Sequence, residues 1–287
     1  MAERQVGDNF ISEQQEVFIK IESKESAVKK RLNEIAGYLF KNKYYKGSGI
    51  IAATVENKGL AKKTLKKLKK QIAHPQSDID LGSSVYEYGM ISALLGITDQ
   101  ATVAMEHCFS RVHGAGTAGA IAAEINDTES VKEAINQLSP TSLDAGTLSA
   151  KLSRITGDTQ DVTKKAEELF GMQKFEIAAY ITALSGNKDF SIKAIDAALY
   201  DRAEKGYLNS IAGEAAAIID DAQRAGKIID LLIKKGNLTG AVKVAGAMGD
   251  MQKMDEIIEV IPETDRIYAL SIAGIRLANF YSRRLRK

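Results

Sequence analysis

GNLTGAVKVAGAM at residues 236–248 is followed directly by GDMQKMDEIIEVI at residues 249–261, and the two stretches share one pattern. Each begins with Gly followed by Asn or Asp, and apolar residues then recur at i, i+3, i+6, i+7 and i+10. The residues on this spacing are Leu238, Ala241, Val244, Ala245 and Met248 in the first stretch and Met251, Met254, Ile257, Ile258 and Ile261 in the second. Because this spacing places them on one face of an α-helix, the sequence predicts two consecutive amphipathic helices.

A Gly-Asn or Gly-Asp pair marks four places in the chain. The pairs are Gly157-Asp158, Gly186-Asn187, Gly236-Asn237 and Gly249-Asp250. Gly adopts the left-handed conformation that ends a helix, and Asn or Asp caps the helix that follows. The pairs are separated by 29, 50 and 13 residues, so the repeat is degenerate. We predict an all-α fold: an irregular, α-solenoid-like array of antiparallel helical hairpins, preceded by a basic helical section.

The composition is that of a helical globular protein. Of the 287 residues 45% are hydrophobic, proline occurs three times and tryptophan is absent. The single cysteine, Cys108, excludes a disulfide within the chain, and the opening residues show no apolar run typical of a secretory signal. No apolar run approaches the roughly 20 residues of a membrane span. We therefore expect a cytoplasmic protein without a membrane span.

Charge divides the chain into two sections. Residues 1–75 carry 16 Lys and Arg against 8 Asp and Glu, whereas residues 76–287 carry 23 against 29. Pro75 ends a helical pattern, and the segment at 74–78 is typical of a linker. We predict a basic N-terminal helical section over 1–75 and a helical-repeat-like region over 76–287. Within the first section we expect a glycine-bearing turn at 46–49.

Residues 60–72, LAKKTLKKLKKQI, form the sharpest amphipathic pattern. Its apolar side carries Ala61, Leu65, Leu68 and Ile72. The opposite side carries Lys62, Lys63, Lys66, Lys67, Lys69 and Lys70. This face has two interpretations: a solvated face of a packed helix, or a contact surface for nucleic acid, anionic lipid or an acidic protein. The absence of arginine from it disfavours base-specific readout of DNA.

A second basic group lies close by in the sequence. Lys41, Lys43 and Lys46, together with Tyr44 and Tyr45, could extend the lysine face and offer aromatic rings for stacking.

Gly114, Gly116 and Gly119 have the spacing G-x-G-x-x-G. A dinucleotide-binding fingerprint requires a β-strand before the first glycine, but residues 98–112 read as a helix that starts at Thr98. We predict a glycine-rich turn between two helices, with no cofactor.

The chain contains three histidines, His74, His107 and His113, and none has a metal-ligand spacing. His107 is adjacent to Cys108, so the two point in different directions on a helix. We therefore predict no catalytic, cofactor-binding or metal-binding residue, while an enzyme centred on Gly114–Gly119 with His107 and His113 remains a distant alternative.

Small residues lie where neighbouring helices would approach in the stretches Lys235–Asp250 and Ala166–Phe175. In this the chain resembles tetratricopeptide and clathrin-type α-solenoids over about residues 155–262. The resemblance implies stacked helical hairpins and a surface that binds another protein. The chain departs from the tetratricopeptide consensus because it has no tryptophan and because the aromatic residue after Gly171 falls at Phe175, one place late.

The last predicted helix, from Asp265 to about Arg286, is apolar over a wide arc. One stripe carries Gly274 and the residues Ile267, Leu270, Leu277 and Tyr281, and a second carries Tyr268, Ile272 and Ile275. A helix of this kind is buried on two sides, and Gly274 would let a neighbouring helix come close. We predict a packed terminal helix or, alternatively, the seam of a homo-oligomer.

Three functional hypotheses follow. The leading one is a non-catalytic interaction or scaffold protein that binds another protein through a helical-repeat surface. The second is a nucleic-acid-associated protein that contacts phosphates through the Lys62–Lys70 face. The distant third is the enzyme around Gly114–Gly119.

Overall fold

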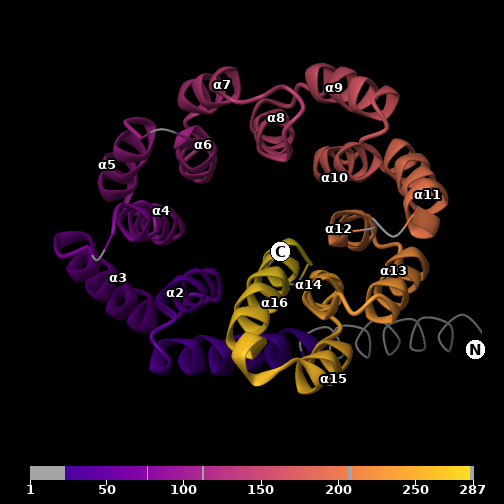
Figure 1. Ribbon diagram of the computed structural model, residues 1–287. Helices are drawn as coiled ribbons and strands as arrows, with labels where there is room; N and C mark the ends of the chain where they lie inside the picture. Colours follow the sequence, from indigo (N-terminus) through magenta and orange to yellow (C-terminus); the bar gives the residue numbers. More distant parts are fainter. Residues whose placement is uncertain (1–22, 76, 112, 206–208, 285–287) are drawn as a thin grey trace, which may run out of the picture.

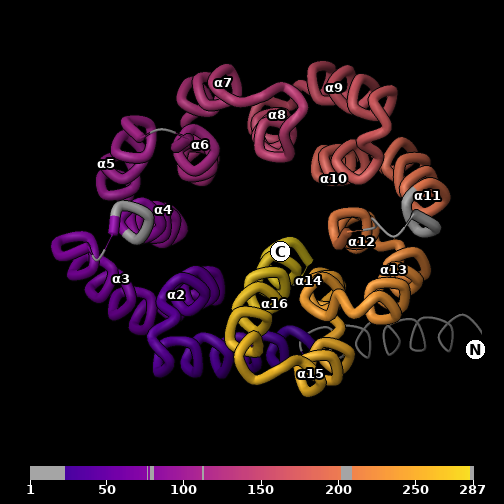
Figure 2. The backbone as a smooth tube through the Cα atoms, viewed as in Figure 1, coloured from indigo at the N-terminus to yellow at the C-terminus, as the bar shows by residue number. Residues whose placement is uncertain are grey.

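The computed structural model describes residues 23–75, 77–111, 113–205 and 209–284, drawn in colour in Figure 1. Figure 2 follows the same chain as a tube through its Cα atoms. Within these ranges the regular elements are helices, and no strand occurs among them. The all-α prediction is therefore confirmed.

The helices follow one another with short turns between them. The first helix is described over residues 23–41. The others are α2 (Tyr45–Thr54), α3 (Lys58–Ala73), α4 (Asp78–Leu94), α5 (Thr98–Phe109), α6 (Ala115–Glu124), α7 (Thr128–Gln137), α8 (Leu143–Thr156), α9 (Gln160–Gly171), α10 (Phe175–Ser185), α11 (Lys188–Lys205), α12 (Ser210–Ile218), α13 (Ala222–Lys234), α14 (Leu238–Met248), α15 (Met251–Val260) and α16 (Glu263–Arg284).

The helices form a closed ring with two layers (Figure 1). Even-numbered helices make the inner layer and odd-numbered helices the outer layer. Each inner helix packs against the next inner helix, from α2 through to α16, and α16 packs against both α14 and α2. The predicted array of helical hairpins is present, and it returns to its own beginning. α2 and the basic helix α3 are one of its hairpins, since α3 packs on α4 as well as on α2.

The two layers differ in sequence for a physical reason. An inner helix is covered by neighbours on several sides, so it is built from small residues that allow close approach, as in α12 (SIAGEAAAI), where most residues are buried. An outer helix faces solvent on one side, so it is amphipathic. In α13, for example, one stripe is buried: Ala225, Ile228, Ile229 and Leu232. Helices rich in small residues therefore alternate with amphipathic helices along the sequence, because inner and outer helices alternate along the chain.

The predicted Gly-Asn and Gly-Asp turns are confirmed at three of the four pairs; at Gly157-Asp158 the N-cap of α9 is instead the next residue, Thr159. The four glycines have φ between 71° and 88°, in the left-handed region. Asn237 then caps α14 by accepting from the backbone N–H of Gly240, and Asp250 caps α15 by accepting from that of Lys253. One pair of residues thus ends one helix and starts the next.

The same turn also occurs without glycine, which the sequence pattern did not reveal. Six other residues have φ between 59° and 65°: Lys43, Glu56, His113, Asn126, Gln173 and Asp220. Three of them precede a capping residue, because Asn57, Asp127 and Asp221 each accept from a backbone N–H three residues on. The repeat is therefore more regular in space than its glycines suggest.

The prediction of a glycine-bearing turn at 46–49 is wrong. Gly47 and Gly49 lie inside α2, where their missing side chains make room for neighbouring helices. A Cβ on Gly49 would lie 2.2 Å from Cδ1 of Ile91 in α4, and one on Gly47 would collide with the side chain of Ser271 in α16. These glycines serve helix packing rather than a turn.

The seam that closes the ring depends on similar close approaches. A Cβ on Gly246 of α14 would lie 2.6 Å from the backbone oxygen of Ala273 in α16. On the other side of α16, a Cβ on Gly274 would lie 2.7 Å from Ile51 of α2, as the sequence indicated for this glycine. Tyr281 near the end of α16 also donates to Glu25 of the first helix at 3.1 Å. α16 is thus a packed terminal helix within the chain, while residues 285–287 of the predicted helix lie outside the described residues.

We expect Gly246→Ala to destabilise the fold by about 1–3 kcal/mol, because the added methyl group meets backbone that cannot move aside. Gly226→Ala is the matched control, because Gly226 lies in α13 with open space around a Cβ. Removing a helical glycine there should stabilise the fold by about 0.5–1 kcal/mol. Urea unfolding followed by circular dichroism measures both. Equal shifts of the two midpoints would contradict the role of Gly246 in the seam.

Candidate functional site

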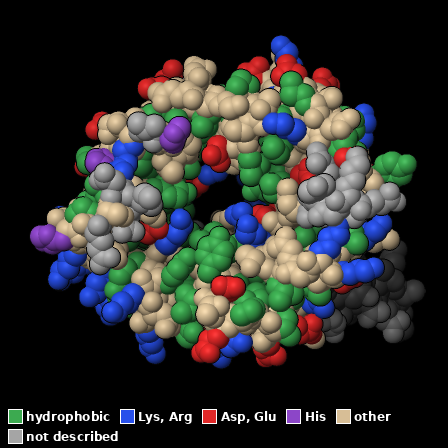
Figure 3. Space-filling view, viewed as in Figure 1, with side chains coloured by type: hydrophobic (Ala, Val, Ile, Leu, Met, Phe, Trp, Pro, Cys, Tyr) green, Lys and Arg blue, Asp and Glu red, His purple; other side chains and the backbone are tan. Residues whose placement is uncertain are grey.

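The lysine face predicted over residues 60–72 lies on α3, an outer helix of the ring. Asn57 caps α3 by accepting from the N–H of Leu60 at 3.1 Å. The apolar side of α3 is buried, with Ala61 and Leu68 at most 1% exposed. The six lysines are all exposed on the other side: Lys62, Lys63, Lys66, Lys67, Lys69 and Lys70. Figure 3 shows Lys and Arg side chains gathered at the outer edge of the ring over α3.

The charges of this face are not neutralised within the described part of the chain. None of the six lysines forms an ion pair or hydrogen bond with a described residue. α3 also has no acidic residue in its first turn. Lysines four residues apart repel one another, and a basic first turn opposes the helix dipole. These repulsions weaken α3 as an isolated helix, whereas the helix propensity of lysine and Lys70 in the last turn act in the opposite direction.

The lysines form two stripes on α3. At about 100° per residue, Lys63, Lys67 and Lys70 fall with His74 within an arc of about 60°. The other three, Lys62, Lys66 and Lys69, fall in a second arc about 100° away. The first group is called here the pocket-side stripe and the second the far stripe. The pocket-side stripe ends at His74, which follows the last residue of α3.

A pocket of about 400 Å³ lies at this end of α3, between α2, α3 and α4. Its lining is polar and aromatic: Lys43, Tyr44, Tyr45, Lys46, Gln71, His74, Pro75, Ser83, Ser84 and Glu87. The structure therefore brings Lys43, Lys46 and both tyrosines of the second basic group to the end of the lysine face.

Glu87 of α4 forms an ionisable group within this pocket. Its side chain is only 10% exposed, it accepts from Ser83 Oγ at 2.9 Å, and Lys46 Nζ lies 3.7 Å from its Oε1. Burial raises the pKa of the Glu87 carboxyl above its ordinary value, although Lys46 and Ser83 act in the opposite direction. Lys46 Nζ also lies 5.7 Å from the centre of the Tyr86 ring. The sequence did not single out Glu87, and its one signal is an acidic residue among the apolar residues of α4.

The three glycines of the G-x-G-x-x-G spacing lie at the start of α6 and inside it. Gly114 is the N-cap of α6, whereas Gly116 and Gly119 are within the helix, so the predicted turn is wrong for these two. A Cβ on Gly119 would lie 2.5 Å from the side chain of Leu148, so this glycine serves helix packing. The element before Gly114 is the helix α5, which begins at Thr98 as predicted, and no strand precedes Gly114 in the described residues.

His107 and Cys108 differ sharply in their surroundings. His107 is exposed on α5, whereas Cys108 is 2% exposed and its thiol lies beside Thr117. Burial raises the pKa of the Cys108 thiol, which lowers its reactivity as a nucleophile. His113 is exposed in the turn before α6. Within the described residues no group of three His, Cys, Asp or Glu side chains could hold a metal ion.

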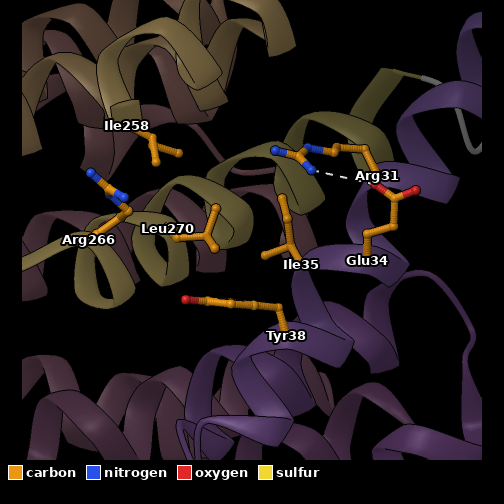
Figure 4. A pocket seen from close by; sticks show the side chains of 7 residues that line it. All are labelled: Arg31, Glu34, Ile35, Tyr38, Ile258, Arg266 and Leu270. Carbon is orange, nitrogen blue, oxygen red and sulfur yellow. Dashed lines mark hydrogen bonds and ion pairs between the residues drawn. The ribbon is translucent and has the colours of Figure 1, made fainter. Parts of the chain in front are cut away.

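A second pocket, of about 330 Å³, lies at the seam of the ring (Figure 4). The first helix contributes Arg31, Glu34, Ile35 and Tyr38, α15 contributes Ile258, and α16 contributes Arg266 and Leu270. The apolar side chains form its walls. Arg31 pairs with Asp255 at 2.5 Å, and Arg266 donates to backbone oxygens. We call this site the seam pocket.

The centre of the ring is hollow in Figure 3, and α16 crosses toward it in Figure 1. Arg276 of α16 pairs with Glu214 of α12, with Nε and Oε2 2.5 Å apart. Burial opposes the charged form of Arg276, but the Glu214 carboxylate holds its pKa above the ordinary value. Ser210 donates to the other oxygen of Glu214 at 3.1 Å. These charges satisfy one another, unlike those of the lysine face.

A comparison with protein-family models, with curated proteins and with solved structures finds no match to this chain. Among the described helices, none combines the length and the apolar composition needed to cross a bilayer. What the chain binds is therefore inferred from its own residues.

We expect Glu87→Gln to gain stability relative to the wild type as pH rises above about 4.5, the ordinary pKa of this carboxyl. The raised pKa means that the folded state holds this proton more tightly than the unfolded state. The contribution of Glu87 to stability is thus fully present below pH 4.5 and is lost as pH rises through its folded pKa. Urea unfolding of both proteins between pH 4 and 8 measures the difference. A difference that stays constant over this range would contradict the assignment.

Proposed function

We propose that this chain is a non-catalytic binding protein that contacts the phosphates of a nucleic acid through the six-lysine face of α3. The observation that supports it is the set of six exposed ammonium groups on one outer helix without a counter-charge among the described residues. Such a surface attracts a polyanion and releases its counterions on binding.

Nucleic acid is favoured over the other acidic partners by what accompanies the lysines. Tyr44 and Tyr45 lie at the end of the same helix, where aromatic rings can stack on bases. The exposed face of α3 carries no large apolar residue that would enter a membrane surface. It also carries no arginine, so we propose contacts to phosphates without recognition of base sequence.

The closure of the ring changes the order of the two leading hypotheses. An open helical array binds its partner in a concave groove along the inner helices. Here each inner helix packs on the next, and α16 closes the array by packing between α14 and α2. The lysine face, on the outer surface, is fully accessible and becomes the better supported binding surface.

We expect fluorescence anisotropy with labelled single- and double-stranded oligonucleotides to show binding that weakens steeply between about 50 and 200 mM salt. Changing Lys62, Lys63, Lys66 and Lys67 to Gln should reduce the slope of log K against log salt by up to about three for a single strand. The matched control changes four exposed lysines on the other outer helices α9, α11 and α13 to Gln: Lys164, Lys188, Lys227 and Lys234.

The control variant should bind like the wild type. Absence of binding at low salt, or the same loss in both variants, would refute the lysine face as a nucleic-acid surface. Equal affinity for polyglutamate or for anionic vesicles would replace nucleic acid with an acidic protein or a lipid surface.

A protein partner remains the second candidate, and the seam pocket favours it. Its apolar walls and Arg266, which forms no ion pair with a described residue, suit an apolar side chain beside a carboxylate. We expect a displayed peptide library to yield binders whose affinity falls in Tyr38→Ala. Tyr200→Ala, which removes an exposed tyrosine on α11, is the control. Selected peptides that bind both variants equally would exclude the seam pocket.

Other predictions from the sequence stay proposals. A cytoplasmic location is supported by the single cysteine, Cys108, which cannot form a disulfide within the chain. Kinship with tetratricopeptide or clathrin-type arrays is supported by the helical hairpins alone. The alternative of a homo-oligomer and the division of the chain into a section over residues 1–75 and a region over 76–287 also stay predictions.

A further inference from the structure

The pocket at the end of α3 is connected to the lysine face by a row of basic side chains. The pocket-side stripe runs along α3 from Lys63 to His74, and His74 itself lines the pocket. Eleven residues of helix at 1.5 Å each make this row about 17 Å long. A polyanionic strand that follows the stripe therefore reaches the pocket with its end.

The pocket has the chemical groups that a nucleotide requires. Lys43 is exposed at its edge and, like His74, could meet a phosphate; neither forms an ion pair with a described residue. Glu87 can accept a hydrogen bond from a sugar hydroxyl or an exocyclic amine. Tyr44 and Tyr45 offer ring faces or edges to a base. Its 400 Å³ falls within the range of about 300–1,000 Å³ that is typical of small-molecule sites.

The aromatic part of the pocket is held in place by the fold. The Tyr45 ring packs edge to face on Phe40, with centroids 5.5 Å apart. Tyr44 is half-buried, and Lys43 ends the first hairpin turn with φ of 62°. Because these groups are already ordered by packing and by the turn, the protein would lose little conformational entropy when a ligand binds.

We infer that this pocket binds one mononucleotide unit, either free or at the end of a strand, with the phosphate on Lys43 and His74 and the base beside Tyr44 and Tyr45. This inference rests on the proposed function, because it names the part of the nucleic acid that the same basic surface recognises. It adds a site with a defined ligand to a surface that otherwise contacts phosphates alone.

Isothermal titration calorimetry of the full chain with adenosine 5′-monophosphate tests the pocket directly. We expect saturable binding at one site that weakens by about tenfold in Lys43→Gln, since a charged contact to phosphate is lost. Lys41→Gln is the matched control, because Lys41 is exposed two residues away and does not line the pocket. Adenosine and inorganic phosphate should each bind more weakly than the mononucleotide.

The two lysine stripes separate an end-bound strand from a free nucleotide. If the pocket holds the end of a strand, Gln at Lys63, Lys67 and Lys70 should weaken binding of a 5′-phosphorylated oligonucleotide more than Gln at Lys62, Lys66 and Lys69. If it holds a free nucleotide, the two triple variants should weaken oligonucleotide binding equally, and the mononucleotide should still bind.

Two results would overturn the inference. The first is that the mononucleotide does not bind, or binds equally well to Lys43→Gln. The second is that inorganic phosphate binds as tightly as the mononucleotide. Either result leaves the proposed function to be decided by the salt-dependent binding of oligonucleotides to the whole lysine face. Conversely, a wild-type chain that binds the mononucleotide but binds no oligonucleotide at low salt would refute the proposed function and support the pocket alone.

Discussion

The close approach of α16 to α14 on one side and to α2 on the other is the constraint on which the ring depends. Gly246 and Gly274 permit it, because a side chain on either would meet a neighbouring helix. Without this approach the array would have two free ends with apolar inner surfaces in water. With it, the inner helices cover one another around the ring, and one buried cluster runs from α8 through α16 and across the seam to the first helix, α2 and α3. Closure thus replaces the capping repeats that an open array needs.

Closure also decides where charge can act. Inside the ring, Arg276 and Glu214 neutralise one another across the helices that flank α14. On the outside, α3 keeps its apolar stripe in the core and presents its lysines to solvent without an ion pair to a described residue. Two polar surfaces made of similar residue types therefore differ in the electrostatic field that they offer to a ligand, because an ion pair that is already formed has little field left. The pocket beside α3 contains both kinds of charge: Lys46 is paired with Glu87, whereas Lys43 is exposed and forms no ion pair with a described residue.

Local patterns in the sequence predicted the local structure and missed what depends on distant contacts. The apolar stripe of α3 and the turns at Gly236 and Gly249 follow from periodicity and from backbone preference, so the sequence contained them. Gly47 was misread as a turn residue because its role depends on Ser271, more than two hundred residues away. Glu87 was overlooked for the same reason, since Lys46 and the α3 terminus make its pocket. No local pattern predicted that the two ends of the array meet.

The contact between Tyr281 and Glu25 joins residues 256 positions apart. In an open repeat protein each unit needs only its neighbours, so folding can begin anywhere and spread along the chain. In a closed ring, the first helix and α2 complete their packing only after α16 has formed, because α16 fills the space beside α2. During synthesis the N-terminal hairpins emerge before α16, so they lack this packing partner. The entropy cost of closing so long a loop is offset only when α16 packs beside α2. The ring is complete only when α16 has packed between α14 and α2, so the fold gains its full cooperativity with that contact.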